Sequence, residues 1–255
     1  MDILINTSHT YQTMERFGMS GAWWAQSVGK WTNTEPDGAP VRDRISELLY
    51  SKEKGIGLGI FRYNLGSGSA ESGKGDYGDP LRRAESFYTP AGLDFTKDAA
   101  AVYMMRRAVA DGAEEVIFFV NSPIEQLTIN GLGHTQKRRT GRTNIKKENI
   151  PAFADYVLNA VEHFLGEGVP IKYISPVNEP LWVWNGGQEG CHYSPRQAAC
   201  VMRVFAEKMK TRPALAGVKL SGMENGDIRW FNKSYTRALL NNRAARPLVD
   251  GVDVH

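Results

Sequence analysis

The sequence lacks several features that would define its class at once. No apolar run approaches the roughly 20 residues that cross a bilayer, and Met1–Gln12 has neither the basic start nor the apolar stretch of a signal peptide. The two cysteines, Cys191 and Cys200, show no metal-ligand spacing, and the histidines share none either. We therefore expect a soluble protein without a membrane partner, a disulfide framework, a bound metal or another cofactor, whose localisation the sequence leaves unknown.

Charge of one sign is also scarce. The 31 Lys and Arg residues nearly balance the 28 Asp and Glu residues, which leaves a net charge of +3. The excess comes from one short segment, in which Glu148 is the single acid beside six cations: Lys137, Arg138, Arg139, Arg142, Lys146 and Lys147. A nucleic-acid surface usually spreads its basic residues over a whole domain, so we expect no nucleic-acid partner.

Apolar β-rich runs alternate along the chain with helical patterns. Strands are expected near Phe17–Ala22 and at Gly57–Tyr63, Val116–Val120, Ile171–Ser175, Val218–Ser221 and Val252–His255. Helices are expected at Val41–Lys52, Thr96–Ala110, Pro151–Leu165, from the Ser194 cap and Pro195 onward, and at Trp230–Asn242. This α/β alternation favours parallel strands in a doubly wound sheet or a (β/α)8 barrel, of which six strands and five helices are present.

The segment after the fourth predicted strand carries the most chemical information. Asn178-Glu179-Pro180 follows an apolar strand directly, and Trp182 and Trp184 come next. Barrel enzymes place catalytic groups at this end of their strands, and indole rings can stack on sugars and raise the pKa of a nearby acid. Two interpretations stay open from these residues alone: Glu179 as a catalytic acid, or Glu179 as a turn cap beside tryptophans that fill the core.

Four segments together resemble glycoside hydrolase family 30. Asn178-Glu179-Pro180 with Gln188-Glu189-Gly190-Cys191-His192-Tyr193 resembles the family's fourth strand end. The other three resemble its first, second and third strands, and they are Phe17-Gly18-Met19-Ser20-Gly21-Ala22-Trp23-Trp24, Arg62-Tyr63-Asn64-Leu65-Gly66 and Asn121-Ser122-Pro123. Within the family, the resemblance is to endo-β-1,6-galactanase-like members.

This resemblance implies a (β/α)8 TIM barrel, incomplete here, with residues 1–255 as its N-terminal part. Residues 2–6 could be a stray strand of the β-sandwich module that relatives carry. It also implies a retaining hydrolase of β-linked glycans, such as β-1,6-galactan, whose partner is an oligo- or polysaccharide. Relatives are often secreted.

The resemblance also assigns roles to residues. Glu179 would be the acid/base, Asn178 would bind the sugar 2-hydroxyl, and Arg62 would lie under the nucleophile. Further substrate contacts would come from Asn121, Trp23, Trp182 and Trp184. The nucleophilic Glu follows the family's seventh strand and matches no position here, so we expect this chain by itself to be inactive.

One further departure from the family pattern, two additional acids and one alternative function accompany the resemblance. Ile124-Glu125-Gln126-Leu127 stands where the family usually has aromatic residues that line the subsite of the reacting sugar. Glu224, after the fifth predicted strand, matches no nucleophile position and is expected to be a substrate contact or a turn residue, while Glu189 could bind a distal sugar or hold its own loop. The alternative function is a non-catalytic glycan-binding protein derived from such a barrel.

Overall fold

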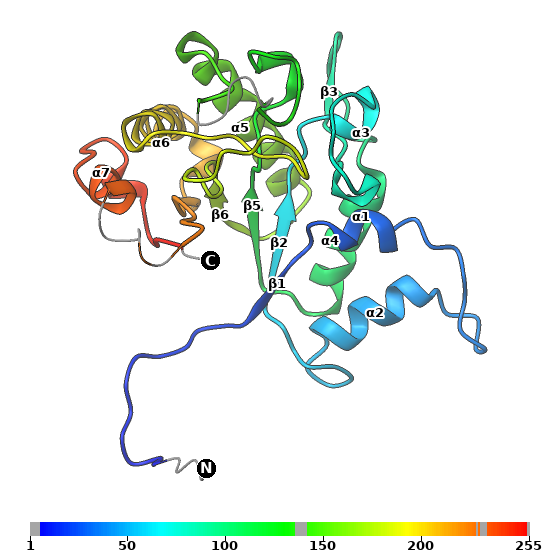
Figure 1. Cartoon of the computed structure of the whole chain (residues 1–255). Coiled ribbons are helices and arrows are strands. Elements are labelled where there is room, and N and C mark those ends of the chain that lie inside the picture. Colours follow the sequence, from blue (N-terminus) through cyan, green and yellow to red (C-terminus); the bar gives the residue numbers. More distant parts are fainter. Residues whose placement is uncertain (1–5, 136–141, 228, 230–233, 254–255) are drawn as a thin grey trace.

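A five-stranded parallel sheet forms the centre of the molecule. The computed structural model describes residues 6–135, 142–227, 229 and 234–253. The sheet order is β1-β2-β5-β6-β7, and every neighbouring pair is parallel. These strands are Gly18–Ser20, Ile60–Asn64, Glu115–Phe119, Ile171–Ser175 and Lys219–Leu220. The predicted α/β class is confirmed, and the sheet with its helices is a partial barrel of the TIM type (Figure 1).

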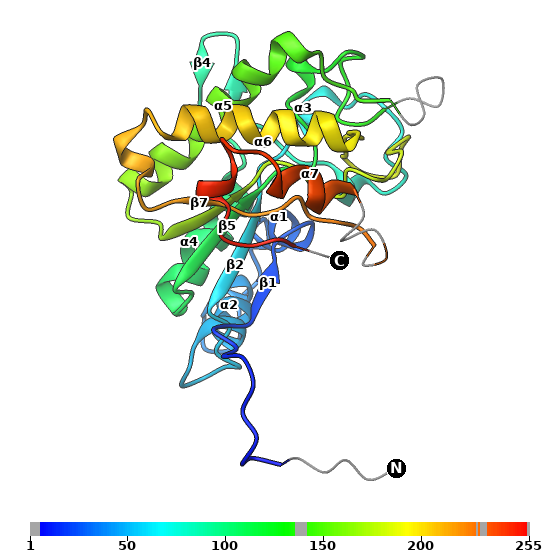
Figure 2. The same cartoon turned by 90° about the vertical axis from the view of Figure 1, so that its left-hand side faces the viewer.

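The longer helices cover the outer face of the sheet (Figures 1 and 2). They are α2 (Val41–Tyr50), α4 (Ala99–Asp111), α5 (Ile150–Gly166) and α6 (Pro195–Met209). The short helices α1 (Trp24–Val28), α3 (Ser69–Ser72) and α7 (Thr236–Leu240) lie in the connections that follow β1, β2 and β7. The first turn of α6 confirms its predicted start, because Ser194 and Gln197 form a capping box and Pro195 takes the first turn. Among the described residues, no helix is both long enough and apolar enough to cross a bilayer.

Alternation along the strands separates the core from the candidate site. Phe61 and Tyr63 in β2 are buried, and their rings lie against Tyr50 of α2 and Phe164 of α5. Arg62 lies between them in the sequence, and its side chain therefore points to the opposite, concave face of the sheet. The buried aromatic pairs hold the strand in place, and the register turns a charged group toward the barrel interior.

The last predicted strand, Val252–His255, is wrong for residues 252 and 253, and residues 254 and 255 lie outside the described residues. The residues just before this segment do run beside β7, where the Asp250 amide donates to the Leu220 carbonyl at 3.2 Å. Within the described part of the chain, a single bridge, between Leu220 and Val249, forms there. Because β7 has just two residues, it offers few pairing positions, and the described sheet has five strands instead of six.

Other differences from the predicted elements are local. The short helices α1 and α3 and a hairpin of β3 (Tyr88–Thr89) and β4 (Gly92–Leu93) were not expected. The helix predicted at Trp230–Asn242 is described only as α7, since residues 230–233 lie outside the described part. The predicted side-module strand at residues 2–6 lies outside it too, apart from Asn6. The long connections after β2 and β5 gather at the carboxyl ends of the strands (Figure 1).

Candidate active site

Three asparagines from successive strand ends form a hydrogen-bonded chain at the carboxyl edge of the sheet. Asn64 ends β2, Asn121 follows β5 and Asn178 follows β6. The Asn178 Nδ2 donates to Asn121 Oδ1 at 2.9 Å, and the Asn121 Nδ2 donates to Asn64 Oδ1 at 3.0 Å. All three side chains are buried. The structure thus brings together the predicted residues Asn121 and Asn178 and adds Asn64, which the sequence analysis left without a role.

Arg62 joins this chain to a buried carboxylate. Its guanidinium forms an ion pair with Glu224, including an Nε contact of 3.3 Å to Oε1, and it donates to Asn178 Oδ1 at 3.2 Å and to Ser20 Oγ at 3.0 Å. The ring of Phe119 lies 3.2 Å below the guanidinium carbon. Glu224 is only 2% exposed. Because arginine only donates, Asn178 must turn its oxygen to Arg62, which fixes the orientation of the amide.

The backbone of Glu179 is held in an unusual conformation. Its φ of +42° lies in the left-handed region that non-glycine residues seldom occupy. The Glu179 amide donates to the Glu224 carbonyl at 2.8 Å, and the Glu179 carbonyl accepts from the Trp184 indole at 3.0 Å. Such strained residues often lie at active sites, where surrounding contacts hold a side chain in one direction. Glu179 is partly exposed at the strand edge.

Trp182 lies next to the Glu179 carboxyl group. Gly226, on the connection after β7, makes this possible, because a Cβ at that position would lie 2.2 Å from the Trp182 indole nitrogen and 3.1 Å from Glu179 Oε1. The Trp182 side chain is 44% exposed. An exposed indole beside a carboxyl group is suited to stack on a sugar ring. Gly226 is a second residue that sequence reasoning missed, and its place in Gly222–Asp227 was the available signal.

Trp184 and Trp23 are placed differently from Trp182. The ring of Trp184 packs on Gly190, where an added Cβ would lie 2.2 Å from it, and its indole donates to the Glu179 carbonyl. Trp184 therefore braces the loop that carries Glu179, and it is only partly exposed. Trp23 is also partly exposed and precedes α1 near the end of β1. Substrate contact by either ring stays a prediction.

The departure at Ile124-Glu125 turns both side chains into the protein. Both residues are buried. One Glu125 oxygen accepts from the Gly133 amide at 3.1 Å and from the Tyr77 hydroxyl at 3.4 Å, and burial raises the pKa of the Glu125 carboxyl. Neither side chain replaces a stacking aromatic residue. Instead, Glu125 ties together the connections that follow β2 and β5, and Ile124 belongs to the hydrophobic core.

Glu189 holds loops together inside the protein. Its carboxyl group is fully buried and accepts from the Ser67 amide at 3.0 Å, the Ser69 hydroxyl at 2.5 Å and the Ala84 amide at 3.4 Å. Burial raises the pKa of Glu189 to about 7, and these hydrogen bonds offset part of that effect. Of the two roles left open by the sequence, the structure supports the fixing of the loops.

This burial predicts a pH-dependent stability that Glu189→Gln removes. The folded-state pKa of about 7 exceeds the ordinary value of 4.5, so folding becomes less favourable as pH rises from about 4.5 to about 7. We expect the wild type to lose up to about 3 kcal/mol over this interval relative to Glu189→Gln. Urea unfolding at pH 4.5, 6 and 8 measures the difference. Glu53→Gln, at an exposed acid, is the matched control, and parallel wild-type and Glu189→Gln curves would contradict the prediction.

The described part of the chain shows neither a metal site nor a disulfide. No group of three or more His, Cys, Asp or Glu side chains is arranged there to hold a metal ion. Cys191 is buried and Cys200 is half-buried, and neither forms a disulfide. Within the basic segment, Lys137, Arg138 and Arg139 lie outside the described residues, whereas Arg142, Lys146 and Lys147 lie within them.

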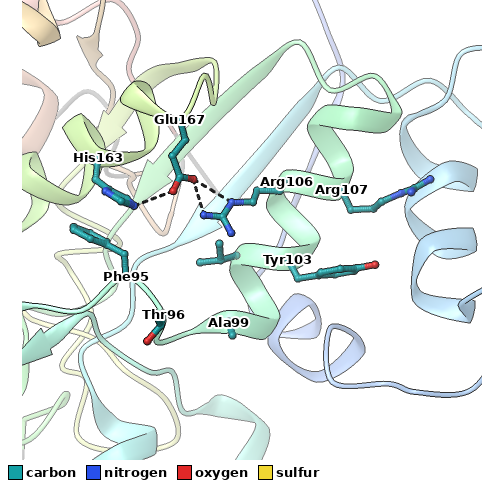
Figure 3. A pocket seen from close by; sticks show the side chains of 9 residues that line it. Phe95, Thr96, Ala99, Tyr103, Arg106, Arg107, His163 and Glu167 are labelled. Carbon is teal, nitrogen blue, oxygen red and sulfur yellow. Dashed lines mark hydrogen bonds and ion pairs between the residues drawn. The ribbon is translucent and has the colours of Figure 1, made fainter.

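A hollow of about 720 Å³ lies on the outer face, between α4 and α5 (Figure 3). Its polar groups bind one another: Glu167 pairs with Arg106 at 2.6 Å and with His163 at 3.0 Å, and the His163 ring stacks on Phe95 at 3.7 Å. These contacts link two neighbouring helices. Because the charges are already paired and the hollow lies on the helix side of the sheet, it is not the candidate active site.

Comparison with known proteins shows which enzymes this chain is similar to. The chain is 24% identical to the endo-β-1,6-galactanase of Hypocrea rufa over 284 aligned residues. This alignment covers 99% of this chain and 54% of that protein. It is 26% identical to an exo-β-1,6-galactobiohydrolase of Bifidobacterium longum subsp. longum over 219 aligned residues. This alignment covers 66% of this chain and 14% of that protein. The chain therefore spans about half the length of the galactanase and a smaller part of the galactobiohydrolase.

The fold has a close counterpart among solved structures. A conserved exported protein from Bacteroides fragilis superposes with a TM-score of 0.79 at 25% identity, over 96% of this chain and 49% of that protein. The profile described as "O-Glycosyl hydrolase family 30" matches residues 1–244. Together with the Asn-Glu pair at the end of β6, this match shows that the chain belongs to glycoside hydrolase family 30.

Proposed function

We propose that the protein that carries this chain hydrolyses β-1,6-linked galactan with retention of configuration. Glu179 protonates the leaving oxygen and then activates water as a general base. The observation that carries this proposal is the position of Glu179: a partly exposed residue at the carboxyl edge of the sheet, on a strained backbone held by Glu224 and Trp184. Both curated relatives are named for β-1,6-linked galactose substrates, which supports the choice of glycan.

Substrate positioning falls to the groups around Glu179. Trp182 offers its exposed indole face to a sugar, and Asn178 offers a fixed amide to the 2-hydroxyl of the reacting unit. Hydrogen bonds to that hydroxyl strengthen as the transition state forms. Asn121 reaches the sugar or supports Asn178, to which it is bonded. Glu224 holds Arg62, whose guanidinium favours ionised groups at the centre of the barrel mouth.

The second carboxylate of a retaining enzyme lies about 5 Å from the acid/base and attacks the anomeric carbon. Its source in this proposal is the part of the relatives' length that the present chain does not span. Glu224 is a poor candidate for the attack, because it is buried and bonded to Arg62. We assign it the positioning of Arg62.

Hydrolysis of defined polysaccharides by the full-length gene product tests this proposal. We expect reducing sugar to be released from β-1,6-galactan at least about tenfold faster than from β-1,6-glucan or glucuronoxylan, in line with the discrimination that a few sugar hydroxyl contacts provide. Proton NMR of the first product should show the β anomer before mutarotation. An initial α anomer would exclude retention. Binding of galactan without any hydrolysis would favour the glycan-binding alternative.

A further inference from the structure

A small pocket of about 300 Å³ lies where α5 and α6 begin. Its apolar wall consists of Ile145, Ile150 and Tyr193, all of which are buried. Its polar margin carries Lys147, Arg196 and Gln197, which are exposed. We call this set of residues the rim pocket. Its volume is at the lower end for ligand sites and suits a single ring better than a long chain.

The rim pocket lies on the same edge of the sheet as Glu179. Each of its helices follows a connection that leaves the carboxyl end of a strand, α5 after β5 and α6 after β6. The Tyr193 amide donates to the carbonyl of Pro180 at 3.1 Å, and the Tyr193 carbonyl accepts from the Tyr235 hydroxyl at 2.7 Å. Pro180 directly follows Glu179. The wall of the pocket is therefore hydrogen-bonded to the segment that carries the proposed acid/base.

The cations at this pocket differ from those elsewhere on the same helix. Farther along α6, Arg203 pairs with Glu207 at 2.9 Å and Lys208 pairs with Asp155 at 2.8 Å. Among the described residues, by contrast, neither Lys147 nor Arg196 forms an ion pair or a side-chain hydrogen bond. The same holds for Arg142 and Lys146, which adjoin Thr143 and Ile145 of the pocket lining in the sequence.

We infer that the rim pocket binds a carboxylate-bearing sugar, a uronic acid unit of the glycan on which the proposed function acts. The apolar wall would contact the C–H face of the ring, while Lys147 and Arg196 would bind the carboxylate. Charge-assisted hydrogen bonds of this kind are stronger than those between neutral groups, and arginine can bind a carboxylate with two parallel bonds. This inference rests on the proposed function only for the identity of the surrounding glycan.

The site is too small and too local for the other common polyanions. A nucleic acid would need basic residues spread along a groove with bases stacked on aromatic rings. The rim pocket instead has two cations at its polar margin and one apolar wall. Glu148 lies directly beside Lys147 in the sequence. One negative charge on one ring matches this distribution.

Calorimetry with two matched ligands tests the inference on the full-length gene product. The ligands are a β-1,6-linked galactotetraose with one glucuronic acid unit and the same tetraose without it. We expect the acidic ligand to bind about tenfold more tightly to the wild type, the change that one or two charge-assisted contacts at an exposed site give. The variant Lys147→Gln/Arg196→Gln should lose this preference and bind the neutral ligand as before.

The control variant Lys30→Gln/Lys210→Gln removes the same charge at exposed positions that form no ion pair with another described residue, and it should keep the preference. Loss of the preference in this control, or equal affinities of the wild type for both ligands, would overturn the inference. Equal binding of a galactotetraose with a sulfate ester would overturn the assignment to a carboxylate.

Hydrolysis is measured separately, so the two proposals can fail independently. If the protein cleaves neutral galactan but does not bind the acidic ligand more tightly than the neutral one, only the inference about the rim pocket is wrong. If the protein cleaves no glycan but prefers the acidic ligand, and this preference is lost when Lys147 and Arg196 are replaced, the inference about the rim pocket is supported and the proposed function is wrong.

Discussion

Glu179→Ala in the full-length gene product should reduce the hydrolysis of β-1,6-galactan by about 10²- to 10⁴-fold, the usual contribution of general acid–base catalysis. An aryl galactoside should be affected differently, because a nitrophenolate leaves without protonation. Its first step should largely survive, whereas the second step still lacks the base that activates water. The glycosyl-enzyme should therefore accumulate, with a burst of nitrophenol followed by slow turnover.

Azide provides the decisive measurement for this variant. A small anion needs no base, so azide should restore turnover of the aryl substrate and yield a β-galactosyl azide when retention holds. Glu148→Ala, which removes an exposed acid on a neighbouring connection, should behave as the wild type in every assay. If Glu179 only caps a turn, its removal should cost about 1 kcal/mol of stability and slow both substrates equally. A defect of that kind, without rescue by azide, would exclude Glu179 from the catalytic role.

Arg62→Leu should have the largest effect on stability. The substitution leaves Glu224, whose side chain is 3% exposed, with a buried charge and without its guanidinium partner. Breaking a buried pair from one side usually costs about 3–5 kcal/mol, more than the pair itself contributes. The hydrogen bond to Asn178 is lost as well, so the orientation of that amide is no longer determined. Urea unfolding measures the loss of stability.

A double-mutant cycle separates the buried charge from the lost packing. Arg62→Leu/Glu224→Gln places a neutral amide at the buried position and should recover about half or more of the lost stability, because it removes the buried charge that has lost its Arg62 partner. Arg44→Leu is the control, since Arg44 pairs with Glu47 near the surface and its loss should change stability by less than about 1 kcal/mol. A double variant as unstable as Arg62→Leu would show that the charge of Glu224 is not the cause.

These predictions describe one connected centre. Arg62 contacts Glu224 and Asn178, the Glu224 carbonyl holds the Glu179 amide, and Gly226 leaves room for Trp182 beside the Glu179 carboxyl. A change at any of these positions should therefore alter the direction of the proposed acid/base as well as the local contact. Stability and kinetics need to be measured together for each variant.

Local sequence patterns predicted much of the architecture. The strand at Ile171–Ser175 has the predicted bounds, and α5 and α6 begin within one residue of the expected starts. The reason is physical: Pro in the first turn, a capping side chain and a period of 3.6 apolar positions act over a few residues. The same is true of the strand ends, where Asn178-Glu179 directly follows an apolar run. These features also predicted the edge of the sheet at which the candidate site lies.

Only the tertiary structure decided which of those residues meet. Arg62 and Glu224 are 162 residues apart, and their pairing depends on the order and register of the strands between them. The amide chain from Asn64 to Asn178 likewise requires adjacent strand ends, and the burial of Glu189 requires loops folded over it. The sequence by itself therefore determined most of the main strands and helices, the edge and the candidate acid, because these follow from local periodicity and motif. The partners, burial and orientation of each group depend on long-range packing, and only the assembled sheet determines them.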